Sequence, residues 1–252
     1  MLPEIGYEGQ EKIRKTKVLL IGAGGIGSSA AYYLAVAGIG KIGIADDDIV
    51  EVSNLNRQIL HNPGRIGLLK VSSAKQTLEE LAPSIDVAVY PGRFETSHAV
   101  TQIIDGYDII IDCSDNYPTR FAINDACIQA RKPWIYGAVS GFEGQAMSII
   151  PGEGPCYRCL YPSAPTSAME NDLPGVIGVT PGIIGLIQAT EAIKYTLGKG
   201  SLLIGRLLFI DLLDINLSEF RVQKNANCPA CGSVELRKPS NMISEGNDGT
   251  KE

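Results

Sequence analysis

The sequence feature that most constrains the fold is a glycine-rich turn, Gly22-Ala-Gly24-Gly-Ile-Gly27. It follows an apolar run at residues 17–22, which predicts a strand buried on both faces, and it precedes residues 28–37, where apolar and small side chains recur at helical spacing. Gly22 permits a tight turn, Gly24 lets the backbone approach a phosphate, and Gly27 allows the helix to pack on the strand. A strand, this turn and a helix in that order predict a nucleotide-binding fold, because the N–H groups of the first helical turn face an anion.

Strand and helix patterns continue to alternate after this turn. Further strands are expected at residues 41–45, 86–90, 107–112 and from 134 onward, and further helices at 70–81 and 119–131. This alternation predicts an α/β fold with a doubly wound, mostly parallel, Rossmann-like sheet.

The pattern changes after residue 144. Residues 145–150 and 207–215 predict antiparallel strands, with a long helix over about 181–197 between them. We expect one domain over residues 1–239, followed by a polar and disordered tail over residues 240–252.

Composition and charge exclude several classes of protein. The chain is 44% hydrophobic and 20% charged, and its net charge of −6 argues against a partner such as nucleic acid or an anionic membrane. Its apolar runs are far shorter than the roughly 20 residues that cross a bilayer. The N-terminus lacks the basic and apolar regions of a signal peptide, so a cytoplasmic location is expected.

An acidic residue follows the second predicted strand. Asp46 lies 19 residues after Gly27, where a carboxylate can accept hydrogen bonds from ribose hydroxyls. NAD, FAD and ATP all fit a glycine turn followed by such an acid. The sequence Gly-Lys-Ser/Thr does not follow the turn, so the site is not a Walker P-loop.

Polar residues after Asp46 favour ATP over a dinucleotide. Arg57 and Lys70 could neutralise charge on the α-phosphate and on departing pyrophosphate. Residues 112–116, Asp-Cys-Ser-Asp-Asn, end a predicted strand, where one carboxylate could hold Mg²⁺ against the phosphates. Taken singly, Lys70 also suits a solvated helix, Arg57 a surface ion pair, and residues 112–116 a helix cap.

Two Cys-x-x-Cys pairs lie in the C-terminal half, Cys156 with Cys159 and Cys228 with Cys231, with 68 residues between them. Each pair can supply two thiolates across a tight turn, and together they complete a tetrahedral zinc shell without an open position. A redox dithiol is the alternative. Two matched pairs in a reducing compartment favour structural zinc.

These motifs together resemble the MoeB/ThiF family, the ubiquitin-activating-like adenylyltransferases of sulfur-carrier proteins (HesA/MoeB/ThiF). The resemblance covers about residues 2–232. It implies ATP-dependent adenylation of the C-terminal glycine of a small β-grasp carrier, similar to MoaD or ThiS and ending in Gly-Gly, with release of pyrophosphate. It also implies a role in molybdopterin or thiamine biosynthesis, and a homodimer.

The resemblance assigns site residues. The family's nucleotide-binding positions fall on Gly25, Asp46, Asn54, Arg57, Lys70, Asp115 and Asn116, and its Mg²⁺ position on Asp115. The glycine turn and the segment after Asp46 add Gly22, Gly24, Gly27, Asp48 and Gln58 as candidate cofactor-binding residues. The candidate catalytic residues are Arg57, Lys70 and Asp115.

One departure from the family concerns sulfur chemistry. Many members carry a cysteine three residues before a stretch that corresponds to Pro174-Gly175-Val176, and here that position is Asn171. Adenylation without a covalent carrier–enzyme step is therefore favoured. The alternatives are a non-catalytic carrier-docking homologue, an NAD-dependent oxidoreductase, and the related tRNA-modifying dehydratases, which the acidic net charge does not support.

Overall fold

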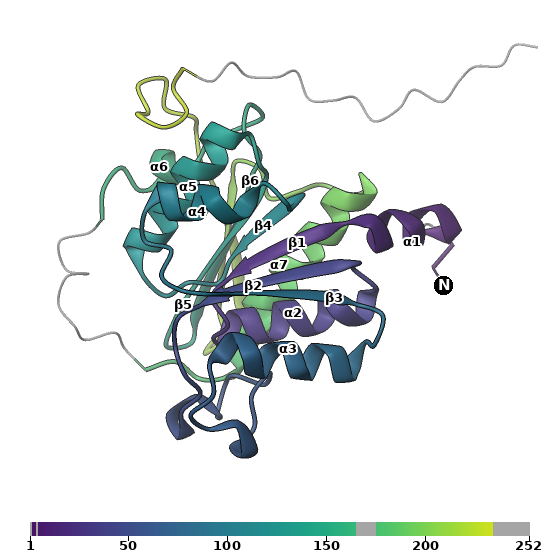
Figure 1. Ribbon diagram of the computed structural model, residues 1–252. Coiled ribbons are helices and arrows are strands. Elements are labelled where there is room, and N and C mark those ends of the chain that lie inside the picture. Colours follow the sequence, from purple (N-terminus) through teal and green to yellow (C-terminus); the bar gives the residue numbers. More distant parts are fainter. Residues whose placement is uncertain (1, 4, 165–174, 234–252) are drawn as a thin grey trace, which may run out of the picture.

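A single mixed sheet forms the centre of the computed structural model, which describes residues 2–3, 5–164 and 175–233 (Figure 1). Within those residues, eight strands follow the order β3-β2-β1-β4-β5-β6-β7-β8; the first five are parallel, and β6 to β8 are antiparallel additions. The strands are β1 (Lys17–Ile21), β2 (Lys41–Asp46), β3 (Asp86–Pro91), β4 (Ile109–Asp112), β5 (Trp134–Ser140), β6 (Glu143–Ile149), β7 (Arg206–Asp211) and β8 (Asn216–Arg221). The order of the parallel strands reverses between β1 and β4, and such a switch point is where ligands bind in open α/β sheets.

Helices cover both faces of the sheet (Figure 1). They are α1 (Gly6–Lys15), α2 (Gly25–Ala37), α3 (Lys70–Leu81), α4 (Ser97–Ile104), α5 (Tyr117–Ala130), α6 (Tyr157–Leu160) and α7 (Val179–Leu197), with short 3₁₀ turns η1 (Val52–Asn54) and η2 (Pro63–Arg65). Because side chains alternate along a strand, Val18 and Leu20 of β1 pack with α2, α3 and α7, whereas Leu19 and Ile21 pack with α4 and α5. The core is therefore two apolar layers on either side of one sheet.

The structure confirms the predicted α/β class, the mostly parallel sheet and the antiparallel C-terminal strands. The single strand predicted at residues 207–215 is wrong, because β7 ends at Asp211 and the chain turns back into β8. Ile215 has a left-handed φ of 52° in this turn, a conformation that apolar periodicity does not reveal. Periodicity also leaves α1 and α4 unpredicted, because α1 buries only Gly9 and Ile13 and α4 only Val100 and Ile104.

Asn171, the domain limit at residue 239 and the tail at residues 240–252 all lie outside the described residues. Among the helices that the structure describes, none has both the length and the apolar character needed to cross a membrane.

Candidate active site

A cavity of about 490 Å³ lies at the carboxyl ends of the parallel strands. Its walls come from the glycine turn, the ends of β2, β3 and β4, residues 56–58, the start of α3 and the start of α7. The volume is in the range of small-molecule sites. The switch point between β1 and β4 therefore coincides with a cavity, as the sequence pattern predicts.

The glycine turn has the steric requirements that the sequence indicates. Gly22 has a φ of 110°, and a Cβ there would lie 2.4 Å from the Cys113 carbonyl oxygen. A Cβ at Gly27 would lie 2.1 Å from the Gly22 carbonyl oxygen, so both positions need glycine. Helix α2 begins at Gly25 without a side-chain cap on its first N–H groups. These donors are available to an anion in the cavity.

Backbone N–H groups hold the Asp46 carboxylate at the end of β2. Its Oδ2 accepts from Ala23 N at 2.7 Å, and its Oδ1 accepts from Asp48 N at 2.8 Å. Burial raises the pKa of Asp46, whereas these two hydrogen bonds and the charge of Lys70 act in the opposite direction. Each oxygen keeps further acceptor capacity for a hydroxyl, because a carboxylate oxygen has two lone pairs.

Lys70 is a buried cation in the cavity wall. Its side chain is 7% exposed, and its Nζ donates to Asp48 Oδ2 at 2.7 Å. The reading of Lys70 as a solvated helix lysine is therefore wrong. Asp48 is 62% exposed, so one partner of the ion pair is largely in solvent and can exchange for an anionic ligand.

Arg57 also lines the cavity and is half-buried. Its Nη1 donates to the Ser53 carbonyl at 2.9 Å and to Asn56 Oδ1 at 3.0 Å, and neither contact is an ion pair. Neither contact neutralises the guanidinium charge, which is therefore available to an anionic ligand.

Asn54 and Gln58 differ in their placement. Asn54 is buried but is not among the residues that line the cavity; its Oδ1 accepts from Glu51 N at 3.1 Å and caps η1. The backbone N–H groups of Arg57 and Gln58 both donate to the Asn54 carbonyl. Asn54 therefore supports the turn that carries Arg57. Gln58 lines the cavity, and its buried Oε1 has no hydrogen-bond partner among the described residues.

Side chains in the segment after β4 have two kinds of role: some line the cavity, and others make hydrogen bonds within the fold. Asp115 is exposed and lines the cavity. Asn116 also lines it, but its Oδ1 accepts from Thr119 N at 2.9 Å and caps α5. Asp112 is fully buried and accepts from Ser114 N and Ser114 Oγ. Burial raises the pKa of Asp112 to about 6, against the opposing charge of Arg120.

Arg93, Phe94 and Arg120 are among the cavity-lining residues that sequence reasoning did not identify. Arg93 and Phe94 follow β3, and Arg93 Nε donates to Asp47 Oδ2 at 2.6 Å. Arg120 on α5 is buried between the rings of Tyr117 and Tyr136 and donates from Nη2 to the Ser114 carbonyl at 3.0 Å. The signal that could have found Arg93 and Phe94 is their place directly after a parallel strand.

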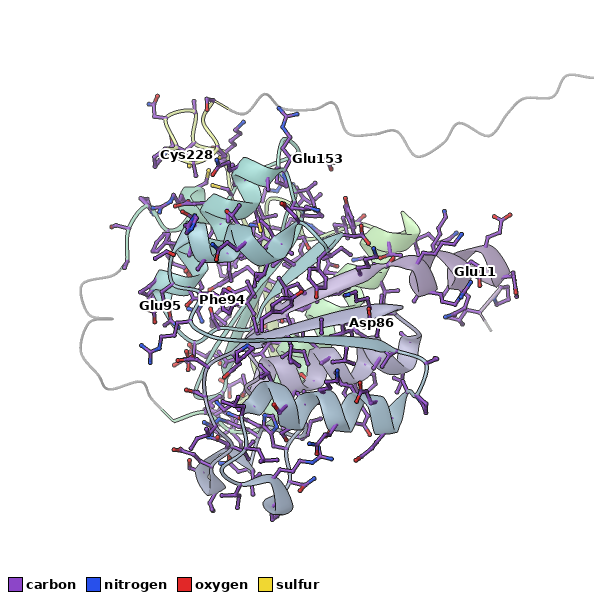
Figure 2. All side chains as sticks on the ribbon, in the orientation of Figure 1. Glu11, Asp86, Phe94, Glu95, Glu153 and Cys228 are labelled. Carbon is purple, nitrogen blue, oxygen red and sulfur yellow. The ribbon has the colours of Figure 1, made fainter. Side chains whose placement is uncertain are left out.

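The four cysteines of the two Cys-x-x-Cys pairs come together in a second site. Cys156 Sγ lies 3.6 Å from Cys228 Sγ, and Cys159 Sγ lies 3.5 Å from Cys231 Sγ. All four sulfur atoms lie within 4.8 Å of one another. In Figure 2 Cys228 lies at the top, apart from Phe94 and Glu95, which follow β3 at the cavity. The cysteines therefore belong to a site separate from the cavity.

Known proteins are similar to this chain over nearly its whole length. The SAMP-activating enzyme E1 of Haloferax volcanii is 42% identical over 234 residues, which are 92% of this chain and 86% of that protein. The sulfur carrier protein adenylyltransferase of Thermus thermophilus is 40% identical over 245 residues, which are 94% and 90% of the two chains. The adenylyltransferase and sulfurtransferase MOCS3 of Drosophila yakuba is 42% identical, and this chain spans about half its length. These names agree with the expectation of an adenylyltransferase.

The chain is also similar to a solved structure in its fold and to a protein family in its sequence. The crystal structure of E. coli MccB with ATP has a TM-score of 0.80 and 22% identity, and the match covers 88% of this chain and 68% of that chain. At that identity the likeness concerns the fold. The sequence itself matches the ThiF family over residues 1–230, so the chain belongs to the ThiF family, as its motifs indicate.

Proposed function

We propose that this protein uses ATP to adenylate the C-terminal glycine of a small ubiquitin-like sulfur-carrier protein, with release of pyrophosphate. The relatives named sulfur carrier protein adenylyltransferase and SAMP-activating enzyme support this substrate class. The observation that carries the proposal is that Lys70 and Arg57 lie in one cavity with the uncapped start of α2. Two cations beside a phosphate site suit cleavage of a phosphoanhydride, whereas hydride transfer would give neither a role.

The nucleotide is bound from two sides. The N–H groups at the start of α2 donate to the phosphates, and Asp46 accepts from the ribose hydroxyls. Phosphate oxygens compete with Asp48 for Lys70 Nζ, since Asp48 is the exposed member of that pair. Gln58 Oε1 is a further buried acceptor at the cavity wall.

The chemical step needs positioning and charge neutralisation rather than a general base. The carrier's C-terminal carboxylate is ionised at neutral pH, and its oxygen attacks the α-phosphorus of ATP. The bond between the α-phosphorus and the bridging oxygen breaks, and pyrophosphate leaves with both bonding electrons. Lys70 and Arg57 neutralise charge that develops on the phosphates, which is how this class of transfer is accelerated.

Asp115 is the residue that would hold Mg²⁺. Its carboxylate is exposed at the cavity after β4, and carboxylate oxygen is the ligand type that Mg²⁺ prefers. When bound, the ion supplies further neutralisation of phosphate charge. Asp112 does not fit this role, because its side chain is fully buried and is bonded to Ser114.

The cysteine cluster fits a structural zinc ion. Four thiolates at the usual Zn–S distance of about 2.3 Å have sulfur atoms roughly 3.8 Å apart, close to the 3.6 Å between Cys156 and Cys228 and the 3.5 Å between Cys159 and Cys231. Burial, followed by hydrogen bonding and charge from Cys231, raises the pKa of Cys156. A bound cation would favour the thiolate form of Cys156. The ion would join the chain after β6 to the chain after β8.

The partners and pathway belong to the same proposal. We infer a carrier that ends in Gly-Gly, a homodimeric enzyme, and a cytoplasmic role in either molybdopterin or thiamine biosynthesis. The carrier's flexible tail would enter the cavity, because its terminal carboxylate must reach the α-phosphorus.

The test is exchange of labelled pyrophosphate into ATP in the presence of Mg²⁺, with and without a carrier that ends in Gly-Gly. We expect exchange that depends on the carrier and stops when the terminal glycine is removed. ATP binding without exchange would instead support a non-catalytic docking protein. Tight NAD binding that excludes ATP would support an oxidoreductase.

A further inference from the structure

His61 is a buried histidine to which the reaction above gives no role. It is 7% exposed, and both ring nitrogens have partners: Nδ1 lies 3.0 Å from Ser73 Oγ, and Nε2 lies 3.0 Å from the Ala23 carbonyl oxygen. Ser73 is fully buried and Ala23 is 1% exposed. The imidazole therefore bridges two segments of the protein away from solvent.

The partners fix the position of the ring proton. A carbonyl oxygen only accepts, so Nε2 must carry the hydrogen that it donates to Ala23. Nδ1 then accepts from the Ser73 hydroxyl. Burial lowers the pKa of His61, as do the charges of Lys70 and Arg65, whereas the bond to Ala23 acts in the opposite direction. The ring is thus neutral, with one tautomer satisfied on both sides.

The bridged segments are those that carry the phosphate-binding groups. Ala23 lies in the glycine turn, and its own N–H donates to Asp46. Ser73 lies on α3, three residues after Lys70, so both side chains emerge from nearly the same side of the helix. The backbone N–H of His61 donates to the Gln58 carbonyl at 3.0 Å, which ties the ring to the turn that carries Arg57.

We propose that His61 is a positioning residue: its Nε2–H tautomer sets the glycine turn, α3 and the Arg57 turn at the spacing that a triphosphate requires. The inference rests on the proposed use of ATP and adds a residue to it. Loss of the bridge leaves the Ala23 carbonyl and the Ser73 hydroxyl without their buried partner. The turn can then shift relative to Lys70, and small displacements of ligand-binding groups have large effects on binding and rate.

The first test reads the tautomer in the full chain without nucleotide. His61 and His98 are the only histidines, and His98 is exposed on α4, so a His98→Gln variant assigns the two rings. Long-range ¹H–¹⁵N correlation spectra are expected to show His61 neutral, with its hydrogen on Nε2, at pH 7. A hydrogen on Nδ1, or a ring that titrates like a free imidazole, would overturn the proposal.

The second test compares two matched variants by calorimetric titration with ATP and Mg²⁺. His61→Gln can place an amide N–H group where Nε2 lies, whereas the shorter His61→Asn can reach Ser73 but not Ala23. We expect the Gln variant to bind ATP within about threefold of wild type and the Asn variant to bind about tenfold more weakly, as for loss of one buried hydrogen bond. Equal affinities in the two variants would refute the positioning role.

A control separates positioning from general destabilisation. Ser148 Oγ donates to Glu191 Oε2 at 2.6 Å in another buried contact, between β6 and α7. Ser148→Ala should lower the stability to urea without changing ATP affinity, and a weakening like that of His61→Asn would overturn the proposal. The proposed function can fail separately, because a wild-type chain that binds ATP but lacks pyrophosphate exchange still allows the comparison. A wild-type chain that does not bind ATP contradicts both inferences.

Discussion

Replacing Lys70 with methionine separates the catalytic role of its charge from any role in folding. Methionine is unbranched and apolar, and it suits the space of the Lys70 side chain, which is 7% exposed. The lost ion pair has an exposed partner, so its contribution to stability is below about 1 kcal/mol. Loss of one positioned group that stabilises developing charge costs about 3 kcal/mol, or roughly a hundredfold to a thousandfold in rate. Activity should therefore fall far more than stability.

The assay is carrier-dependent pyrophosphate exchange, with urea unfolding of the same preparations. Lys41→Met is the matched control, because Lys41 Nζ also forms an ion pair, 2.9 Å from Asp86 Oδ2. Lys41 and Asp86 are the first residues of β2 and β3, at the edge of the sheet away from the cavity. Lys41 is 31% exposed and Asp86 is 63% exposed. The control should change stability by a similar small amount and leave exchange near the wild-type rate.

Three outcomes would count against this reasoning. If Lys70→Met kept more than about a tenth of wild-type exchange, the charge would not act on the reacting phosphates. If its loss of activity followed a large loss of stability, the buried ammonium would be structural. An equal loss of exchange in Lys41→Met would show that the assay responds to surface charge in general.

Three further outcomes are expected. Asp115→Ala should reduce exchange at least a hundredfold while its thermal unfolding midpoint stays near that of wild type; near-normal exchange would contradict the Mg²⁺ assignment. Elemental analysis should find one zinc ion per chain, lost in Cys228→Ser together with several kcal/mol of stability in urea, whereas a disulfide in the purified protein would argue for redox chemistry. The pKa of Asp112 is raised to about 6 in the fold, so the folded protein binds a proton there more tightly than the unfolded chain does. The contribution of this proton to stability is complete below the unfolded-state pKa of about 4 and is lost as the pH rises through 6. Asp112→Asn should remove that decline, worth up to about 3 kcal/mol, in urea titrations from pH 4 to 7, and an unchanged pH profile would exclude this cause.

The parts of the site that sequence predicts are those that local geometry determines. The glycine turn is one: Gly22 has a left-handed φ of 110°, and a Cβ at Gly27 would clash with the Gly22 carbonyl oxygen in the same turn. Asp46 is another, because the end of an apolar run marks the end of a strand. The identity of Lys70 as a helix-start residue is also local, but its burial depends on packing by distant segments.

The residues that sequence did not predict depend on long-range register. Asp46 pairs with Pro91 in the parallel register of β2 and β3, and this brings Arg93 beside Asp47. The place of Arg93 directly after a parallel strand indicates the ligand-binding edge of the sheet, but its pairing with Asp47 depends on the strand order, which the sequence does not give. Arg120 lies on a helix whose residues are mostly buried around it, so its position among aromatic rings does not follow from amphipathic spacing.

A buried polar atom in the cavity wall links the site to the energetics of the fold. Gln58 Oε1 lines the cavity and is buried without a hydrogen-bond partner among the described residues. Such an atom costs about 1–3 kcal/mol. Asp112 Oδ2 and Arg120 Nε also lack a hydrogen bond within that part of the chain, but they face each other at 3.8 Å as a buried ion pair and so belong to the fold. A ligand that donates a hydrogen bond to Gln58 Oε1 recovers part of the cost only when it is bound. Part of the selectivity for a polar ligand is thus present in the ligand-free fold, and the apolar layers must offset the cost.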